Sequence, residues 1–312
     1  MTAPATPVRV LVLGDLVLDV VLLAGRTVER GTDVPGRVEM RQGGSAANTA
    51  RWLGRLGART QLVCAVGRDG AGRSLVRSVE RDGVVVRATR VAGVRTGRIG
   101  VLVTPGGERS FVADRRAALL LRPEGLRPEW FVGLDLVHLP AYSFLGEPVA
   151  GAARGAVELA RAAGARISVD LSSVGPLLEQ GRRSAQALVR SLDADVLFAN
   201  TSEAAAFLGR SGPEGLLDFG RVVVVKHGAR GATVFARQGE GPELRFEVAT
   251  TPVAATDTTG AGDAFSAGFI VGWLEALAAG RAAADALHRA TVAGHRAAAR
   301  QLTAARPELP AG

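Results

Sequence analysis

The sequence predicts an α/β protein with a mainly parallel central sheet and a second, small β-sheet. Two observations favour this class. Short apolar runs typical of buried strands alternate with Ala-rich helical segments along most of the chain, which is the pattern of a parallel sheet with helical crossovers. Between residues 95 and 114 this alternation breaks, and two strand-like runs flank a turn instead. The 312 residues are enough to bury a large core.

The first element is a continuous apolar strand over 8–13, which ends at Gly14. A strand that is apolar throughout is typical of a sheet that is buried on both faces. The alternation that follows predicts a helix over 45–56, a strand over 60–66, a helix over 70–81 and a strand over 83–88.

Two separated segments carry strand patterns outside this alternation. Residues 20–42 contain short apolar pieces interrupted by glycines and a proline, which indicates irregular strands away from the main core. Residues 98–103 and 109–113 flank the turn Pro105-Gly106-Gly107 and predict a β-hairpin. We expect the two segments to pair into one sheet. The expected division is 1–19 core, 20–42 first insertion, 43–94 core, 95–117 second insertion, and 118–312 core with the nucleotide-binding and catalytic segment.

Regular alternation resumes in the C-terminal half of the chain. We expect strands over 135–139, 166–170, 195–199 and 221–225, with helices over 148–163, 181–192 and 202–209 between them. Residues 231–249 predict two further strands. Two long Ala-rich helices over 261–279 and 281–302 complete the fold.

The charge of the chain says little about its partners. The net charge is +8, but Lys226 is the only lysine and all other basic residues are arginines, which indicates a compositional bias. A basic surface helps to attract nucleotide phosphates. Runs of basic residues with interleaved aromatics are absent from the sequence, so we do not expect nucleic-acid binding.

Two features favour a cytoplasmic protein. The single cysteine, Cys64, cannot form an intrachain disulfide and falls in an apolar strand, so a buried inert thiol is expected. The apolar stretch over 8–24 is interrupted by Asp15 and Asp19 and falls short of the roughly 18 apolar residues of a membrane span. We therefore expect no membrane association.

The segment Asp257-Thr258-Thr259-Gly260-Ala261-Gly262-Asp263 carries the clearest chemical signal. Its glycines allow the backbone to approach a ligand closely, and the helix expected after it directs free N–H groups at an anion. The carboxylate of Asp263 lies in the first turn of that helix, where the helix dipole favours the ionised form. An acid beside an anion-binding turn suits phosphoryl transfer to a hydroxyl group.

This segment resembles the C-terminal signature of the ribokinase-like (PfkB) carbohydrate kinases. Gly43-Gly44-Ser45-Ala46-Ala47-Asn48-Thr49-Ala50 resembles the N-terminal signature of the same family, and the resemblance spans roughly residues 8–300. It implies a three-layer α/β/α core with a β-sheet lid built from two insertions. It also implies ATP-dependent, Mg²⁺-requiring transfer of a phosphoryl group to a sugar or sugar-like acceptor, and a homodimer through the lid.

The resemblance assigns roles at the C-terminal signature. Asp263 is expected to be the catalytic base, and Gly260, Ala261 and Gly262 the anion hole. Asp is ionised at neutral pH without any tuning of its reference pKa of about 3.9, and it can take the hydroxyl proton late in the reaction. Asp257 matches a ligand for a monovalent cation such as K⁺ in some members.

Two further segments resemble the family's nucleotide site. Asn200 and Glu203 match an Asn-x-x-Glu motif that helps to hold Mg²⁺ and phosphate, largely through water, and the same residues also suit a helix start. Lys226, Gly228 and Gly231 match the segment beneath the nucleotide, although a lysine at a strand end is often only solvated.

On the acceptor side, Asp19, Gly43, Gly44 and Asn48 match positions that contact the sugar. An Asp and an Asn can bind adjacent hydroxyls. Arg98, Arg109, Asp114 and Arg116 of the hairpin are candidates to reach the site when the lid closes, and an arginine there suits an acidic sugar. The sequence has Val17 and Ser45 where ribokinases proper tend to carry a polar residue and a lysine. These departures argue against ribose itself as the acceptor.

Three alternative functions remain at this point. A nucleoside kinase of the same family differs only in its acceptor pocket. A sugar- or nucleoside-binding regulator that has lost catalysis is disfavoured by the intact Gly260, Gly262 and Asp263. A dinucleotide-binding oxidoreductase is disfavoured because Gly14-Asp15-Leu16, and not Gly-x-Gly-x-x-Gly, follows the first strand.

Overall fold

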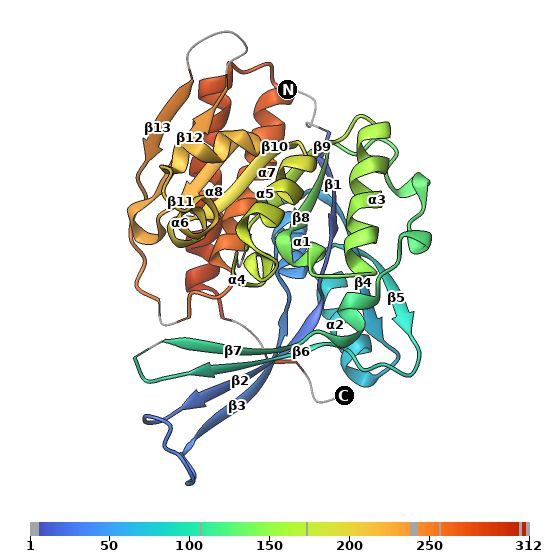
Figure 1. Cartoon of the computed structure of the whole chain (residues 1–312), viewed down its shortest axis with the longest axis vertical. Coiled ribbons are helices and arrows are strands. Elements are labelled where there is room, and N and C mark those ends of the chain that lie inside the picture. The colour runs from blue at the N-terminus through green and yellow to red at the C-terminus, as the bar shows by residue number, and fades with distance from the viewer. Residues whose placement is uncertain are drawn as a thin grey trace.

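The computed structural model describes residues 6–106, 108–172, 174–237, 243–255, 257–305 and 308–309. Within these residues the chain forms a nine-stranded sheet and a separate four-stranded sheet (Figure 1). The large sheet has the spatial order β13 (Leu244–Val248), β12 (Ala232–Ala236), β11 (Gly220–Lys226), β10 (Ala194–Asn200), β9 (Arg166–Asp170), β8 (Leu136–Pro140), β1 (Arg9–Leu13), β4 (Arg59–Gly67) and β5 (Val85–Val91). Neighbours from β11 to β5 are parallel, and β12 and β13 are antiparallel. The predicted mainly parallel sheet is confirmed.

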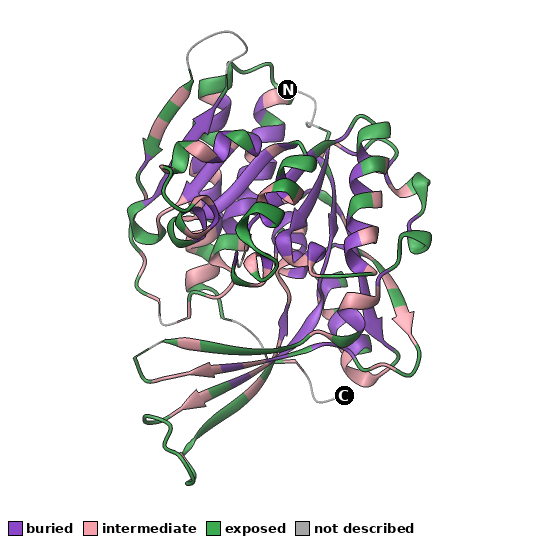
Figure 2. Ribbon diagram, in the orientation of Figure 1, coloured by how far each residue is buried: buried purple, intermediate pink, exposed green. Residues whose placement is uncertain are grey.

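Helices cover both faces of the large sheet because its strands are apolar on both sides (Figure 2). Val10 and Val12 of β1 pack toward one face, and Leu11 and Leu13 toward the other. The first face carries α1 (Ser45–Arg55), α2 (Gly70–Glu80), α7 (Ala261–Ala278) and α8 (Ala283–Thr303). The second carries α3 (Val149–Ala162), α4 (Val174–Leu178), α5 (Arg182–Ser191) and α6 (Thr201–Leu208).

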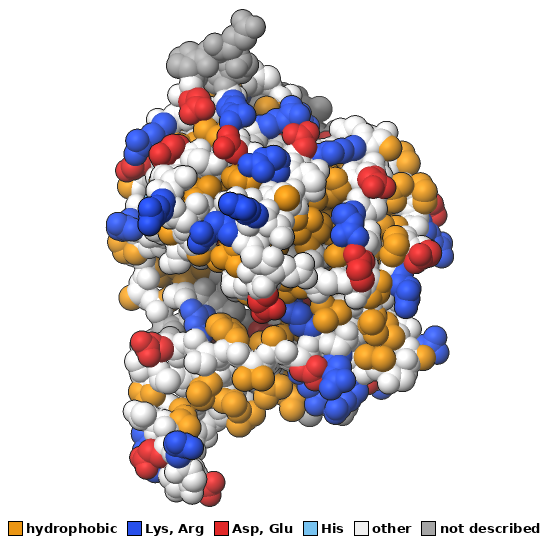
Figure 3. Space-filling view, viewed as in Figure 1, with side chains coloured by type: hydrophobic (Ala, Val, Ile, Leu, Met, Phe, Trp, Pro, Cys, Tyr) orange, Lys and Arg blue, Asp and Glu red, His pale blue; other side chains and the backbone are white. Residues whose placement is uncertain are grey.

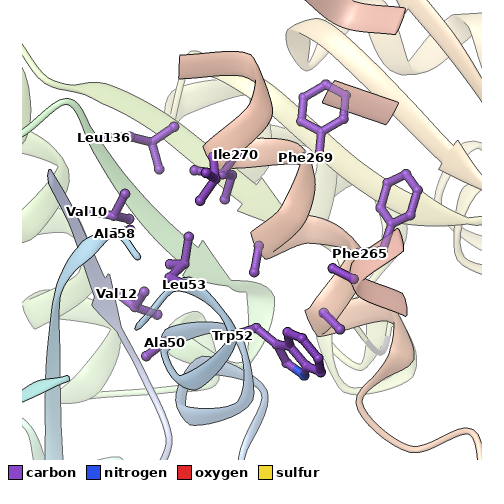
Figure 4. Close-up of a cluster of buried hydrophobic side chains, with 14 of the residues drawn as sticks. Val10, Val12, Ala50, Trp52, Leu53, Ala58, Leu136, Phe265, Phe269 and Ile270 are labelled. Atoms are coloured by element: carbon purple, nitrogen blue, oxygen red, sulfur yellow. The ribbon is translucent and has the colours of Figure 1, made fainter. Parts of the chain in front are cut away.

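Helices α1 and α7 pack together over the centre of the sheet. Figure 4 shows Leu53 of α1 and Ile270 of α7 among the buried side chains of this core. Phe198 of β10 meets Phe265 and Phe269 of α7 edge to face, at centroid distances of 6.5 and 5.2 Å. Because α7 is buried on nearly all sides, its position and the direction of its N-terminus are set by the core.

The small sheet has the order β3 (Gly36–Gly43), β2 (Val17–Ala24), β6 (Arg98–Val103) and β7 (Arg109–Asp114). The first part of this sheet, β2 and β3, begins at Val17 and ends at Gly43, slightly outside the expected insertion at 20–42. Strands β2 and β3 are regular, and they pair along their full length. The expectation of irregular strands is wrong because most of the glycines and the proline fall in the connection 25–35. Gly107 of the expected hairpin turn lies outside the described residues.

Several short elements have no counterpart in the sequence prediction. Besides α4, they are the 3₁₀ turns η1 (Arg116–Leu120), η2 (Pro123–Gly125), η3 (Pro128–Trp130), η4 (Ala141–Phe144), η5 (Pro213–Asp218) and η6 (Gly228–Arg230). Each spans six residues or fewer, which is too short for a hydrophobic period to appear in the sequence. Three of them contribute to the lining of the site described below, α4 through Pro176, η4 through Tyr142 and η6 through Gly228.

The single cysteine and the length of the helices can both be compared with the sequence predictions. Cys64 is fully buried in β4, and burial raises the pKa of its thiol to about 12. The expected burial of the thiol is confirmed, and a raised pKa disfavours the thiolate, which is the reactive form. No helix in the described part of the chain is both long enough and apolar enough to cross a membrane.

Candidate active site

The carboxyl ends of β1, β9, β10 and β11 meet the N-termini of α1 and α7 beneath the small sheet. Because these strands are parallel, their carboxyl ends share one edge of the sheet, which is where open α/β sheets bind ligands. A cavity of about 930 Å³ lies there, and Figure 3 shows the surface hollowed between the small sheet and the body of the molecule. Its lining includes Asp15, Asp19, Gly44, Ser45, Asn48, Arg109, Arg115, Asp170, Asn200, Glu203, Lys226, Gly228, Gly260, Gly262 and Asp263.

Asp263 lies in the first turn of α7, and α1 provides its hydrogen-bond partners. Ser45 Oγ donates to Asp263 Oδ1 at 2.7 Å, and Asn48 Nδ2 donates to Oδ2 at 2.9 Å. Burial raises the pKa of the Asp263 carboxyl to about 6, although these two hydrogen bonds act in the opposite direction. The sequence suggested an untuned acid, whereas the fold moves this pKa closer to neutrality.

Asn48 lines the cavity, as expected for an acceptor-side residue, and it also contacts the acid of α7. Its Nδ2 binds the carboxylate of Asp263, and its Oδ1 accepts a hydrogen bond from Gln42 Nε2 at 3.2 Å. Arg51 Nη1 in turn donates to Gln42 Oε1 at 2.5 Å. The hydrogen bonds of Asn48 therefore orient the carboxylate of Asp263, and the Asn48 side chain is also part of the cavity wall.

The turn before α7 exposes the N–H groups that the sequence predicted. Gly260 caps the helix in the left-handed conformation with φ of 77°, which a glycine adopts without strain. Gly262 and Asp263 are in the first turn, where N–H groups have no acceptor within the helix. Ala261 N already donates to Thr258 O at 3.3 Å. Gln301 Nε2 donates to Thr259 O at 2.8 Å and supports the turn from α8.

Lys226 forms a buried ion pair with Asp170, a residue that the sequence analysis did not single out. The Nζ–Oδ2 distance is 2.7 Å, and Ser266 Oγ of α7 donates to the same Oδ2 at 2.8 Å. Burial opposes ionisation of both groups, but their mutual attraction keeps the pKa of Asp170 low and that of Lys226 high. Asp170 ends a predicted strand, and that position was a signal that could have identified it.

Asn200 and Glu203 cap α6 reciprocally. Asn200 Oδ1 accepts from Glu203 N, and Glu203 Oε2 accepts from Asn200 N, both at 2.8 Å. Burial, with a contribution from Asp170, raises the pKa of Glu203 to about 7. Three carboxylates, Asp170, Glu203 and Asp263, thus share one lysine, and this excess of negative charge suits a cation bound with phosphate.

The described residues contain no cluster of three or more acidic, His or Cys side chains arranged to hold a metal directly. Mg²⁺ does not require a direct cluster of this kind, because it keeps much of its hydration shell and is commonly held through water and substrate phosphates. The side-chain oxygens of Asn200 and Glu203 at the cavity, which can accept further hydrogen bonds from bound water, therefore fit a hydrated Mg²⁺.

The segment after β11 lies only partly at the cavity. Gly228 lines it, whereas Gly231 is packed against the backbone of β13 and is not part of the lining. His227 Nδ1 and Nε2 lie 2.8 and 2.7 Å from the hydroxyls of Thr201 and Thr233. The His227 ring thus has hydrogen-bond partners on both nitrogens.

The expected acceptor residues meet where β2 and β3 leave the core. Asp19 of β2 lines the cavity and lies so close to Gly43 that a Cβ there would fall 1.9 Å from its Oδ1. Asp15, after β1, accepts a hydrogen bond from Ala46 N at 3.2 Å, and Gly44 precedes α1 beside it. Two carboxylates therefore face the cavity near the N-terminus of α1.

One arginine of the small sheet contacts the turn before α7. Arg109 of β7 binds the hydroxyls of Thr258 and Thr259, and its Nη1 lies 3.4 Å from Asp257 Oδ1. Arg41 Nη1 of β3 lies 2.8 Å from Asp257 Oδ2. The Asp257 carboxylate is thus held by two guanidinium groups, which compete with any cation for its oxygens.

The other hairpin candidates are less involved. Arg98 is exposed, and Asp114 and Arg116 form an exposed ion pair with each other. Arg115 lies between these two residues and lines the cavity. The sequence did not identify it as a site residue, because no motif distinguishes it from the many other arginines.

Fold and site together define a ribokinase-like kinase. Residues 8–309 match the family model "pfkB family carbohydrate kinase", and the chain belongs to this family. It is a sugar or nucleoside kinase of the PfkB family, and the predicted family and fold are confirmed.

Individual relatives differ in the acceptor that their names state. The chain is 34% identical over 273 residues to an ATP-dependent ribose-1-phosphate kinase from Halopiger xanaduensis, covering 86% of this chain and 85% of the relative. It is 29% identical to a fructokinase from Klebsiella pneumoniae, covering 85% and 84%. An adenosine kinase from Sinorhizobium meliloti has the same fold, with a TM-score of 0.81, 24% identity and coverage of 97% and 96%.

The buried ion pair leads to a stability prediction. Lys226→Met leaves the Asp170 carboxylate, which is 3% exposed, without its partner, and we expect the free energy of unfolding to fall by about 3–5 kcal/mol. Urea unfolding measures this change. Arg237→Met breaks an exposed pair with Asp218 and should cost no more than about 1 kcal/mol. Equal stability of the two variants would contradict a structural role for the buried pair.

Proposed function

We propose that the protein transfers the γ-phosphoryl group of Mg-ATP to a hydroxyl group of a sugar or sugar-like molecule, with Asp263 as the base. The single observation that carries this proposal is the position of Asp263. Its carboxylate is held by Ser45 and Asn48 at a cavity, beside the free N–H groups of the first turn of α7. An acceptor hydroxyl that donates to this carboxylate would be oriented toward a phosphate held at the same turn.

Asp263 takes the hydroxyl proton as the new O–P bond forms. Phosphoryl transfer has a loose transition state, so the base acts late and mainly positions the nucleophile. A pKa of about 6 lets the carboxylate stay ionised at neutral pH while it becomes a stronger base than an ordinary Asp. Asn48 and Ser45 hold its two oxygens in place during this step.

Two groups of positive charge would stabilise the negative charge on the transferring phosphoryl oxygens, one at the N-terminus of α7 and one at Lys226 and the bound Mg²⁺. The N–H groups of Gly262 and Asp263 and the positive end of α7 provide fixed dipoles. Lys226 Nζ lies beneath the same turn, since a Cβ on Gly262 would be 3.4 Å from it. Asn200 and Glu203 would hold Mg²⁺ through its water, and the bound ion would supply further positive charge to the phosphates.

Asp15 and Asp19 line the same cavity, where they would accept hydrogen bonds from the acceptor hydroxyls. This arrangement supports a polyol such as a sugar, and a nucleoside presents the same ribose hydroxyls. A nucleoside kinase therefore stays the alternative within the family. We also propose that the small sheet acts as a lid, because Arg109 joins it to the turn before α7 across the cavity.

Removal of the base should lower turnover by orders of magnitude. For Asp263→Asn we expect kcat to fall by about 10²–10⁴-fold, because the amide cannot accept the proton, while ATP binding changes little. ADP release in a coupled assay measures turnover, and calorimetry measures ATP affinity. Asp218→Asn, at an exposed carboxylate far from the cavity, is the matched control. Turnover close to that of the wild type in Asp263→Asn would remove Asp263 from the mechanism.

The raised pKa of Asp263 predicts the acid limb of the pH profile. The active form is the carboxylate, so kcat/KM for the acceptor should be constant above the pKa of about 6 and fall by about tenfold per pH unit below it. Rates at saturating Mg-ATP between pH 4.5 and 8 measure this limb. The residual rate of Asp263→Asn should lack the transition, and a flat wild-type profile down to pH 5 would argue against the assignment.

We further propose a homodimer through the outer face of the small sheet. Leu22, Val38, Met40 and Val112 are exposed on that sheet, with Val112 at 76%, and Figure 3 shows hydrophobic side chains gathered along it. Contiguous apolar surface of this kind is typical of an interface. We expect sedimentation equilibrium to report a dimer, and Val38→Glu with Val112→Glu to shift it to monomer. A monomeric wild-type protein at micromolar concentration would refute this proposal.

A further inference from the structure

Arg115 is a mostly buried arginine in the wall of the active-site cavity, directly after β7. Its Nη1 lies 2.7 Å from Asp15 Oδ2, and its guanidinium lies over the ring of Tyr142, 4.1 Å from the centroid. The side chain is only 14% exposed. Because an ion pair and an aromatic ring hold the planar group at once, its orientation is set before any ligand enters.

Most of the donors of this guanidinium have no acceptor among the residues that the structure describes. A guanidinium has five N–H donors, and Asp15 uses one of them. No other hydrogen bond of Arg115 side-chain atoms is made with residues in the described ranges. The other cations of the cavity differ in this respect, since Arg109 is bound to the turn before α7 and Lys226 to Asp170.

Arg115 also stands where the active-site cavity meets a second one. The neighbouring cavity of about 1030 Å³ shares Ala113, Arg115 and Pro176 with the first. An acceptor that occupies the first cavity therefore has room for an additional group beside Arg115. A free sugar has no group that needs a buried cation at this point.

The guanidinium and the proposed base are joined through consecutive residues of α1. Ser45 Oγ donates to Asp263, and the next residue, Ala46, donates its N–H to Asp15, which in turn holds Arg115. Arg115 and Asp263 both line the cavity of about 930 Å³, so one molecule bound there faces both groups. A single acceptor can therefore place a hydroxyl at Asp263 and another group at Arg115.

We infer that the acceptor is a sugar that carries a phosphate ester, and that Arg115 binds this phosphate while the reactive hydroxyl faces Asp263. The inference rests on the proposed kinase function and specifies its acceptor. A planar guanidinium with paired free donors matches a phosphate in two parallel hydrogen bonds. Arg115 is also required on charge grounds, because Asp15, Asp19 and Asp263 would otherwise repel an anionic acceptor from the cavity.

The test compares ribose 1-phosphate with ribose, two acceptors that differ only in the phosphate. For the wild type we expect kcat/KM to be at least about 100-fold higher with ribose 1-phosphate. Arg115→Met should lower kcat/KM for ribose 1-phosphate by about 10–100-fold, mainly through KM, because a charged hydrogen-bond pair is lost. Arg115→Lys keeps the charge beside Asp15 but loses the planar fork, and should give an intermediate value.

Arg127→Met is the matched control, because Arg127 is an exposed arginine stacked on Trp130 and lines neither cavity. It should leave the preference for the phosphorylated sugar unchanged. Circular dichroism verifies that each variant is folded. A wild-type protein that phosphorylates ribose or a nucleoside better than ribose 1-phosphate overturns the inference while the kinase function stands. An Arg115→Met variant with unchanged KM for ribose 1-phosphate overturns it as well.

Failure of the kinase function itself has a separate signature. If no acceptor elicits ADP release, calorimetric titration of ribose 1-phosphate into the ADP-bound protein decides the inference independently. Saturable binding that is lost in Arg115→Met and retained in Arg127→Met supports the site. Absence of binding to the wild type overturns it.

Discussion

The buried ion pair between Lys226 and Asp170 is the interaction on which the arrangement of the site depends. Asp170 ends β9 and Lys226 ends β11, so the pair spans the strand between them, and Ser266 joins it to α7. A buried carboxylate and ammonium are tolerated only as partners, because each alone would be costly to desolvate. The pair therefore ties the edge of the sheet to the helix that carries Asp263.

Helix packing controls the chemistry of that acid. The core sets α1 and α7 side by side, and their first turns meet where Ser45 and Asn48 bind Asp263. Burial raises the pKa of the acid while these hydrogen bonds restrain the rise. The same turn of α1 binds Asp15, so one short piece of helix positions both the proposed base and the part of the cavity wall that holds Arg115.

Local patterns were sufficient for most of the fold. The strands of the large sheet and the long helices carry clear apolar runs or stripes, and their predicted ranges agree with the structure to within a few residues. The first half of the small sheet was harder to predict, because the glycines and the proline of the connection 25–35 obscured two regular strands, β2 and β3, that pair with each other. The segment 257–263 was recognisable as a family motif because its glycines, threonines and acids are contiguous.

The sequence by itself determined the fold class, the family and the segment 257–263, since apolar periodicity and contiguous motifs are properties of neighbouring residues. Tertiary structure alone decided what those residues contact. It brought Asn48 into contact with Asp263 and paired Lys226 with the buried Asp170. It also placed two arginines against Asp257 and placed Arg115 against Asp15 in the cavity wall. These outcomes depend on residues far apart in the chain, and burial and charge at such contacts exist only once the chain has folded.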